Sequence, residues 1–134
     1  MAVNLTVPNY IRTAAARGLQ LKADGFGGDG LVEKTIREAR SMADGTITVD
    51  KVIRANAWGA RHAVDLKASK NRDANADGWP GAGAVAHYLW GINPLNPEPA
   101  RAWFARKAEQ IASDRAWGPD LIVRYQQLYS RHDG

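Results

Sequence analysis

The sequence predicts an all-α protein, a compact bundle of about five to six short helices joined by loops rich in Gly, Pro and Asn. Three observations indicate this fold class. Apolar residues recur at spacings of three and four along most of the chain, which is the period of an amphipathic helix. Clusters of Gly, Pro, Asn and Asp separate these patterns. The β-like fragment at residues 46–49 is short and is better explained as the start of a helix.

The first helical pattern covers residues 11–19. Thr6 or Asn9 is expected to cap its N-terminus, and Pro8 stands where the start of a helix tolerates proline. The pattern leads into a glycine-rich loop, residues 24–30. Its apolar side consists of Ile11, Ala14, Ala15, Gly18 and Leu19.

Two further patterns follow the glycine-rich loop. The first pairs Glu33 with Arg37 at i, i+4 and stops at Asp44-Gly45. Its apolar stripe is Val32, Ile36, Ala39 and Ala43. Thr48 is expected to cap the next helix. The apolar side of that helix is Val49, Val52, Ile53, Ala57, Ala60 and Val64.

A polar loop, residues 67–81, separates these helices from three more. The fourth helix ends at Gly91, and the fifth begins at Asn96, expected as its cap, followed by Pro97. The apolar residues of the fourth are Ala82, Val85, Ala86, Leu89 and Trp90. Those of the fifth are Ala100, Trp103, Phe104, Ala108 and Ile111. Those of the sixth are Leu121, Tyr125 and Leu128, with Trp117 stapled onto Ile122.

Length and composition predict one domain over residues 1–134, with a core over about 7–128 and a frayed tail at 129–134. The chain is 45% hydrophobic and 24% charged and contains five Trp, which is typical of a globular protein. It has no apolar run near the roughly 18 residues that span a bilayer, and its start lacks the pattern of a secretory signal. We expect no membrane association.

The residue types argue against several kinds of chemistry. The chain contains no Cys, which excludes disulfides, thiolate nucleophiles and thiolate-bound metals. Its three His share no short spacing of the kind that metal sites use. No Ser or Thr is placed beside a base as a nucleophile, and no second carboxylate for acid and base catalysis is identifiable. We expect no catalytic residues, cofactor, metal or small-molecule substrate.

Two loops resemble ligand-binding motifs. Asp73, Asn75 and Asp77, followed by Gly78, match the first half of a calcium loop, but Ala84 stands where that loop needs a bidentate Glu. A weak cation site competes there with a polar turn held by Asx hydrogen bonds, and the turn is favoured. The glycine-rich loop could present N–H groups to phosphate, but no strand precedes it, so a tight turn is favoured.

Charged residues of the third helix allow two interpretations. Asp65 lies at i+4 from Arg61 and i+3 from His62, so these three residues and Trp90 are expected to form a structural node between the third and fourth helices. Alternatively, basic and aromatic side chains could grip phosphates and stack a base, because the net charge is +4 and the pI near 9.6. That nucleic-acid face would use Arg12, Arg17, Arg54, Trp58 and Arg61.

A succession of short motifs resembles a small helical domain of tailed-bacteriophage proteins, which occurs alone or beside head-morphogenesis and maturation-protease segments. The resemblance spans about residues 7–112. The motifs are Asp29-Gly30, Arg37-Glu38-Ala39-Arg40, Asp44-Gly45, Ala57-Trp58-Gly59-Ala60-Arg61-His62, Pro80-Gly81-Ala82-Gly83-Ala84-Val85-Ala86 and Leu89-Trp90-Gly91. The chain departs from that pattern at Trp58-Gly59, where an aromatic pair is usual, and at Ile92, where a second glycine is expected.

The resemblance implies a non-enzymatic structural or accessory protein that binds other phage proteins, in the virion or in the host cytoplasm during assembly. The protease chemistry of neighbouring segments has no matching residues here. The surfaces expected to bind are the loops at residues 25–30 and 67–79 and the segment 125–132. Two alternatives stay open: a module that binds phage DNA or RNA, and an inhibitor of a host bacterial enzyme.

Overall fold

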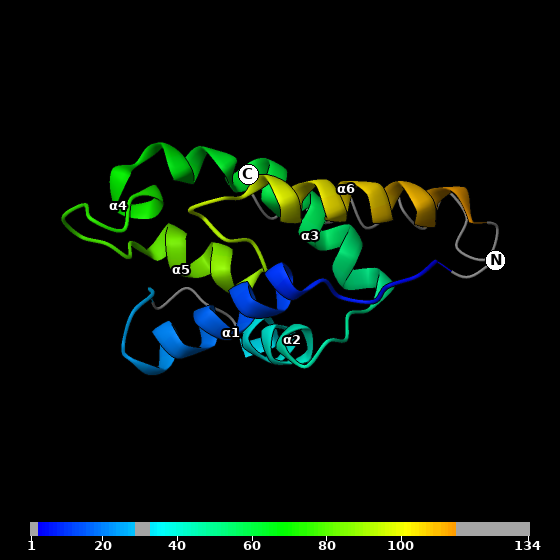
Figure 1. Ribbon diagram of the computed structural model, residues 1–134, viewed down its shortest axis with the longest axis horizontal. Helices are drawn as coiled ribbons and strands as arrows, with labels where there is room; N and C mark the ends of the chain where they lie inside the picture. Colours follow the sequence, from blue (N-terminus) through cyan, green and yellow to red (C-terminus); the bar gives the residue numbers. More distant parts are fainter. Residues whose placement is uncertain (1–2, 29–32, 115–134) are drawn as a thin grey trace.

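A computed structural model describes residues 3–28 and 33–114 of the chain. Over these residues the fold is all-helical with no strand, which confirms the predicted fold class (Figure 1). The elements are α1 (Asn9–Ala23), α2 (Glu33–Ala43), α3 (Val49–His62), the 3-10 helix η1 (Ala63–Lys67), α4 (Ser69–Arg72), α5 (Ala82–Leu89) and α6 (Glu98–Ser113).

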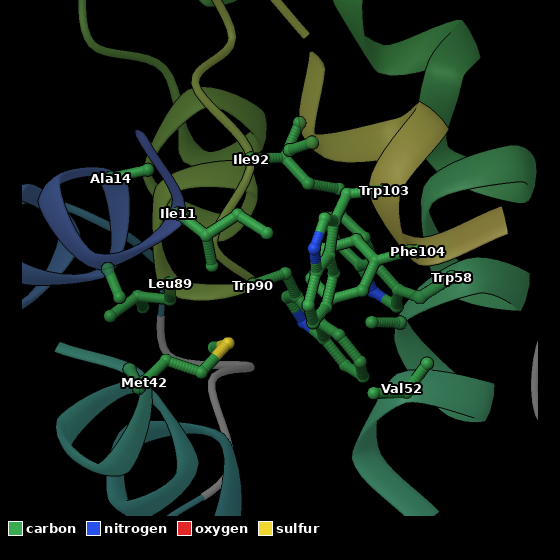
Figure 2. Packing of buried hydrophobic residues seen from close by; sticks show 14 of the residues in the cluster. Ile11, Ala14, Met42, Val52, Trp58, Leu89, Trp90, Ile92, Trp103 and Phe104 are labelled. Atoms are coloured by element: carbon green, nitrogen blue, oxygen red, sulfur yellow. The ribbon is translucent and has the colours of Figure 1, made fainter. Parts of the chain in front are cut away.

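The helices form two packed groups that meet at α5. In one group α1 packs against α2 and α5, and in the other α3 packs against α6 (Figure 1). Figure 2 shows the junction: Ile11, Met42 and Leu89 lie on one side of Trp90, and Trp58, Trp103 and Phe104 lie on the other. All of these side chains belong to one buried cluster. One core therefore serves the described part of the chain.

Helix α1 buries most of the predicted stripe but begins without a side-chain cap. Ile11, Ala14, Ala15, Gly18 and Leu21 are buried, whereas Leu19 is only half-buried. Thr6 and Asn9 were expected as caps, and both expectations are wrong. Thr6 donates its hydroxyl proton to Asn4, Asn9 is the first helical residue, and the cap position falls on Pro8. The Pro8 carbonyl accepts from the N–H groups of Ile11 and Arg12.

Helix α2 is rotated relative to the predicted stripe. Thr35, Ala39 and Met42 are buried, while Ile36 and Ala43 are half-buried and Val32 lies outside the described residues. The predicted pair of Glu33 and Arg37 is formed at 3.5 Å on the exposed face.

Helix α3 begins as predicted but buries a different face. The Thr48 hydroxyl accepts from the N–H of Lys51 at 3.0 Å, which confirms the cap. Val52 and Ile53 are buried, but Ala60 is exposed and Val64, now in η1, is 57% exposed. Lys51, Arg54 and Trp58 occupy the interior instead. The apolar pattern failed here because buried charges took positions that were assigned to solvent.

The polar loop predicted at residues 67–81 contains the end of η1 and the single turn α4. Asn71 in this loop is buried, with 5% of its surface exposed. The Asn71 amide donates to the Asp65 carbonyl at 2.9 Å and accepts from the N–H of Ala84 at 3.1 Å, so it caps α5 from outside the helix. A Cβ at Gly81 or Gly83 would lie 2.3 Å or 2.6 Å from this side chain. The glycines therefore make room for the cap.

Helix α5 is the central element, because it packs against α1, α2, α4 and η1. Val85, Leu89 and Trp90 are buried as predicted, but Ala82 is exposed and Ala86 half-buried. Gly91 ends the helix with φ +82°, and the next N–H, that of Ile92, donates to the His87 carbonyl.

Helix α6 buries all five residues that the pattern predicted: Ala100, Trp103, Phe104, Ala108 and Ile111. The expected cap is wrong, since the cap position falls on Pro97 without a side-chain hydrogen bond and not on Asn96. The sixth predicted helix, with Trp117, Leu121, Ile122, Tyr125 and Leu128, lies outside the described residues.

Candidate functional site

The most unusual feature of the interior is a buried charge cluster, which consists of Glu38, Asp50, Lys51 and Arg54. The Arg54 guanidinium binds both carboxylate oxygens of Glu38, at 3.0 Å for the Nη1–Oε1 pair, and donates from Nε to Asp50 at 2.7 Å. The Lys51 ammonium donates to Glu38 Oε1 at 3.2 Å. Lys51 is 2% exposed and Arg54 is 8% exposed. One carboxylate on α2 thus anchors two cations on α3.

Burial and the neighbouring charges shift the pKa values of this cluster. Burial lowers the pKa of Lys51 to about 8, aided by the positive charges of Arg54 and Lys34 and opposed by Glu38. Burial alone would raise the pKa of Glu38, but the hydrogen bonds and charges of Arg54 and Lys51 together hold it below its ordinary value. The ammonium of Lys51 is therefore the less well compensated charge of the pair.

A stack of rings connects the charge cluster to the end of α3. The Lys51 Nζ lies 3.4 Å from the centroid of the Trp90 ring, a cation–π contact. Trp90 stacks on Trp58 with centroids 4.9 Å apart and an 8° interplanar angle, and Trp58 stacks on His62 at 4.4 Å. Figure 2 shows the two indoles side by side in the core. His62 Nδ1 lies 2.9 Å from the Asp65 carboxylate.

The structural node predicted around His62 exists in part and is larger than predicted. The contact of His62 with Asp65 is formed, and Trp90 joins it through Trp58. Arg61 is half-buried on the same turn of α3. Sequence reasoning did not place Trp58 in this node. The i, i+4 spacing of Trp58 and His62, which puts two rings on one side of a helix, was the available signal.

His87 is a histidine of α5 that is 1% exposed. Its Nδ1 lies 2.8 Å from the Gly83 carbonyl, so Nδ1 carries the proton and donates it. Burial lowers its pKa. Its ring packs edge-on against Trp58 at 4.8 Å, and its buried Nε2 has no hydrogen-bond partner in the described part of the chain. His87 therefore completes the aromatic packing between α3 and α5.

The predicted nucleic-acid face does not form as a surface. Arg54 and Trp58 are each 8% exposed, because Arg54 binds Glu38 and Asp50 and Trp58 lies in the ring stack. Arg12 and Arg17 are exposed, but on α1, which packs on α2 and α5. Arg12 also donates to the Ala43 carbonyl at 3.3 Å. The Asp50–Arg54 spacing of i, i+4 was the sequence signal for an internal ion pair.

The loop at Asp73 forms a turn in the structure, whereas the glycine-rich loop is described only as far as residue 28. The Asp73 carboxylate accepts from the N–H of Asn75 at 2.9 Å, the Asx turn that the sequence favoured, and Asp77 is exposed nearby in the chain. Within residues 3–28 and 33–114, no group of three His, Asp or Glu side chains is placed to hold a metal ion. In the glycine-rich loop, Phe26 is 41% exposed. Residues 29 and 30 of that loop and the expected binding segment 125–132 lie outside the described residues.

Among the hollows on the described surface are the α3–α6 groove and the Lys51 cavity. The α3–α6 groove, of about 250 Å³, is lined mainly by small residues of both helices together with Asn56, Glu98 and Arg101. Those small residues are Ala55, Gly59, Ala60, Ala102 and Ala105, with Phe104 beside them. The Lys51 cavity, of about 140 Å³, lies where α2 ends and α3 begins. It is lined by Glu38, Ser41, Thr46, Ile47, Thr48 and Lys51.

Comparison of the chain with known protein families, with curated proteins and with solved structures finds no match. Among the described helices, none has the length and apolar character needed to cross a membrane.

Proposed function

We propose that this chain is a non-enzymatic structural or accessory protein of a tailed bacteriophage, which binds other proteins in the virion or, in the host cytoplasm, during its assembly. The order of motifs that resembles a phage helical domain supports the phage context. The α3–α6 groove carries the proposal that the protein works by binding, and the partner that fits it is an amphipathic helix of another phage protein.

The groove suits a helix because its walls are made of small side chains. Ala60, Ala102 and Ala105 are exposed, so a third helix could approach α3 and α6 closely. The groove has room for large apolar side chains above Phe104, which is 1% exposed. Docking of an apolar helix face into such a groove is a common mode of peptide recognition. The pair of exposed Glu98 and half-buried Arg101 could fix the register of the partner.

The nucleic-acid alternative has less support. Two of its five residues, Arg54 and Trp58, are committed to the interior, and the exposed arginines of α1 stand on a different element. A mobility-shift assay over a range of salt concentrations tests this alternative. Micromolar binding that weakens steeply with salt and is lost when Arg12 and Arg17 are both replaced by Ala would support it.

The test of the proposed function uses site-specific photo-cross-linking in the full chain. A cross-linking residue at position 102, in the groove, is compared with one at position 16, because Ala16 is equally an exposed alanine but lies on α1. Purified particles and assembly intermediates should contain the protein. Position 102 should cross-link to a helical segment of one virion protein, whereas position 16 should not.

A synthetic peptide of the cross-linked segment then provides the quantitative test. It should bind the wild-type chain in calorimetry and lose at least about tenfold in affinity to Ala102→Trp, which fills the groove, but not to Ala16→Trp. The proposal is wrong if the protein is absent from both particles and intermediates, or if Ala102→Trp binds the peptide as well as Ala16→Trp does.

A further inference from the structure

Lys51 is a buried cation that shares its counter-ion with a second cation. The Glu38 carboxylate accepts from two nitrogens of Arg54 as well as from Lys51, so Arg54 takes the larger part of its charge. Lys34 adds a further positive charge to the surroundings of Lys51. A buried charge is costly unless it is paired and hydrogen-bonded. Arg54 also donates to Asp50, so two carboxylates serve the two cations of the cluster, and Glu38 is the carboxylate that pairs with Lys51. Because Glu38 is shared in this way, the Lys51 ammonium can take a further hydrogen-bond acceptor.

The donors around Lys51 are not all used. An ammonium group has three N–H donors. Within the described residues, one of them goes to Glu38 and the face of Trp90 takes a second, which leaves a third. The Thr48 hydroxyl accepts from the backbone N–H of Lys51, so its own proton is still available for donation. Two donors thus remain for a ligand.

The residues that carry these donors line the Lys51 cavity. Its volume of about 140 Å³ exceeds the share of a single water, about 30 Å³, several times. Lys51, Thr48 and Glu38 form part of its wall, and Ile47 supplies an apolar surface. A dianion such as phosphate would be repelled by the charged Glu38 more strongly than a monoanion. A carboxylate with a short alkyl chain matches the size, charge and apolar wall.

We propose that the Lys51 cavity binds the carboxylate group of a small monoanion, which accepts hydrogen bonds from Lys51 and Thr48 and packs its alkyl part against Ile47. The carboxylate could belong to a free short-chain acid or to an acidic side chain of a bound protein. This site is separate from the α3–α6 groove, and it goes beyond the proposed binding of a helix. Its test needs no knowledge of the protein partner.

Propionate is the probe, and the full-length chain is titrated with it at pH 7.5 in constant ionic strength. The pKa of Lys51, followed through the chemical shift of its ¹³Cε, should rise from about 8 because a bound anion favours the charged amine. The melting temperature should rise saturably. Above pH 8 the affinity should fall by up to about tenfold per pH unit, because the free protein loses its ammonium charge.

Two variants assign the response to the cavity. Ile47→Trp fills the cavity and leaves the pairing of Lys51 with Glu38 in place, so it should abolish the propionate response. Val64→Trp is the matched control, because it places the same ring at an exposed apolar position in η1 and should respond as the wild type does. Lys51→Gln should also abolish the response. If Lys51→Gln does not fold, the comparison of Ile47→Trp with Val64→Trp still shows whether the propionate response comes from the cavity.

The source of the carboxylate is found by comparing propionate with a blocked peptide that contains one Glu. Tighter binding of the peptide would assign the site to an acidic side chain, and tighter binding of propionate would assign it to a free acid. The proposal is overturned if about 100 mM propionate leaves the Lys51 signal and the melting temperature unchanged, since affinity weaker than this has no specific site behind it. An equal response to chloride, or an equal response of Ile47→Trp, would overturn it as well.

Discussion

Glu38 is the residue on which the interior charges depend. Its carboxylate pairs with both Lys51 and Arg54, which come from another helix and are almost completely buried. Replacing a buried ion pair by apolar residues can be neutral, but removing one partner leaves an uncompensated charge in the interior. The cluster is therefore more sensitive to loss of Glu38 than to loss of any exposed charge.

Substitution Glu38→Gln should lower the free energy of unfolding by about 3–5 kcal/mol, the usual cost of breaking a buried pair. The control is Glu33→Gln on the same helix, where the pair with Arg37 is largely exposed and the change should be within about 0.5 kcal/mol. Urea unfolding of both variants measures the difference. Equal stability of the two would show that the cluster does not hold α2 to α3.

Lys51 should make stability rise with pH in the alkaline range. Its pKa is about 8 in the folded protein and 10.5 ordinarily, so between these values the unfolded chain binds more protons than the folded one. The contribution of this group to the free energy of unfolding is constant below pH 8 and increases above it, by at most about 1.4 kcal/mol per pH unit. If the pairing with Glu38 dominated, it would raise the pKa of Lys51, and stability would instead fall as the pH rises.

The measurement compares wild type with Lys51→Met in urea unfolding at pH 7, 8, 9 and 9.5. The wild type should gain stability relative to the variant only above pH 8. The range stops below pH 10 because burial raises the pKa of Tyr88, and a raised phenol pKa makes stability fall as pH rises through the ordinary value. Parallel curves for the two proteins would refute the prediction.

At the scale of elements, the approach of α1 to α5 depends on Gly18. A Cβ at this position would lie 2.7 Å from the backbone nitrogen of Leu89, and backbone cannot move aside as a side chain can. Gly59 on α3 differs, because a Cβ there would meet side-chain atoms, the Cδ1 of Ile92 at 3.2 Å and the Cγ of Arg101 at 3.9 Å. The contact at Gly18 is therefore with backbone and leaves no room for a side chain, whereas the contact at Gly59 is with side chains.

Substitution Gly18→Ala should destabilise the protein by about 1–3 kcal/mol, the range for overpacking a tight contact. Gly59→Ala should be near neutral or stabilise by up to about 1 kcal/mol, because alanine has the higher helix propensity and Ile92 can yield. Thermal and urea unfolding of the matched pair give the two values. A Gly18→Ala variant as stable as Gly59→Ala would mean that the two helices are not as close as described.

The elements differ in how far the sequence predicted them. Helix α6 was predicted residue by residue because its apolar positions are large and regularly spaced. Helix α3 was misassigned because periodicity places charged residues in solvent, and the carboxylate that allows Lys51 and Arg54 to be buried lies on α2, beyond any i, i+4 relation. The cap of α5 by Asn71 could not be predicted from a local pattern either, because Asn71 accepts from the N–H of Ala84, thirteen residues further along the chain.

At the scale of the whole molecule, α5 should be the last element to open. It packs against four other elements; its own His87 packs edge-on against Trp58, and Trp90, which directly follows it, stacks on Trp58. Native-state hydrogen exchange should therefore show the amides of Val85 and Leu89 among the slowest to exchange, and those of the single turn α4 among the fastest. Uniform exchange across α5 and α4 would contradict this order.

The fold class followed from the sequence, while the placement of the candidate site did not. Helical periodicity and turn residues are local signals, and they suffice for an all-α fold. The α3–α6 groove lies between helices that are distant in sequence, and the Lys51 cavity lies where the chain passes from α2 to α3. Helical periodicity predicts neither hollow. Each hollow depends on how the helices are arranged in space, so it can be found only from the three-dimensional structure.

The parallel indoles of Trp58 and Trp90 have an optical consequence. Stacked indoles with nearly parallel planes and centroids 4.9 Å apart should couple electronically, so the ultraviolet spectrum of the native state should differ from that of two isolated indoles. Because one ring belongs to α3 and the other directly follows α5, this signal would vanish as soon as those two helices separate. The absorption of these two indoles therefore reports whether the group of α1, α2 and α5 is still packed against the group of α3 and α6.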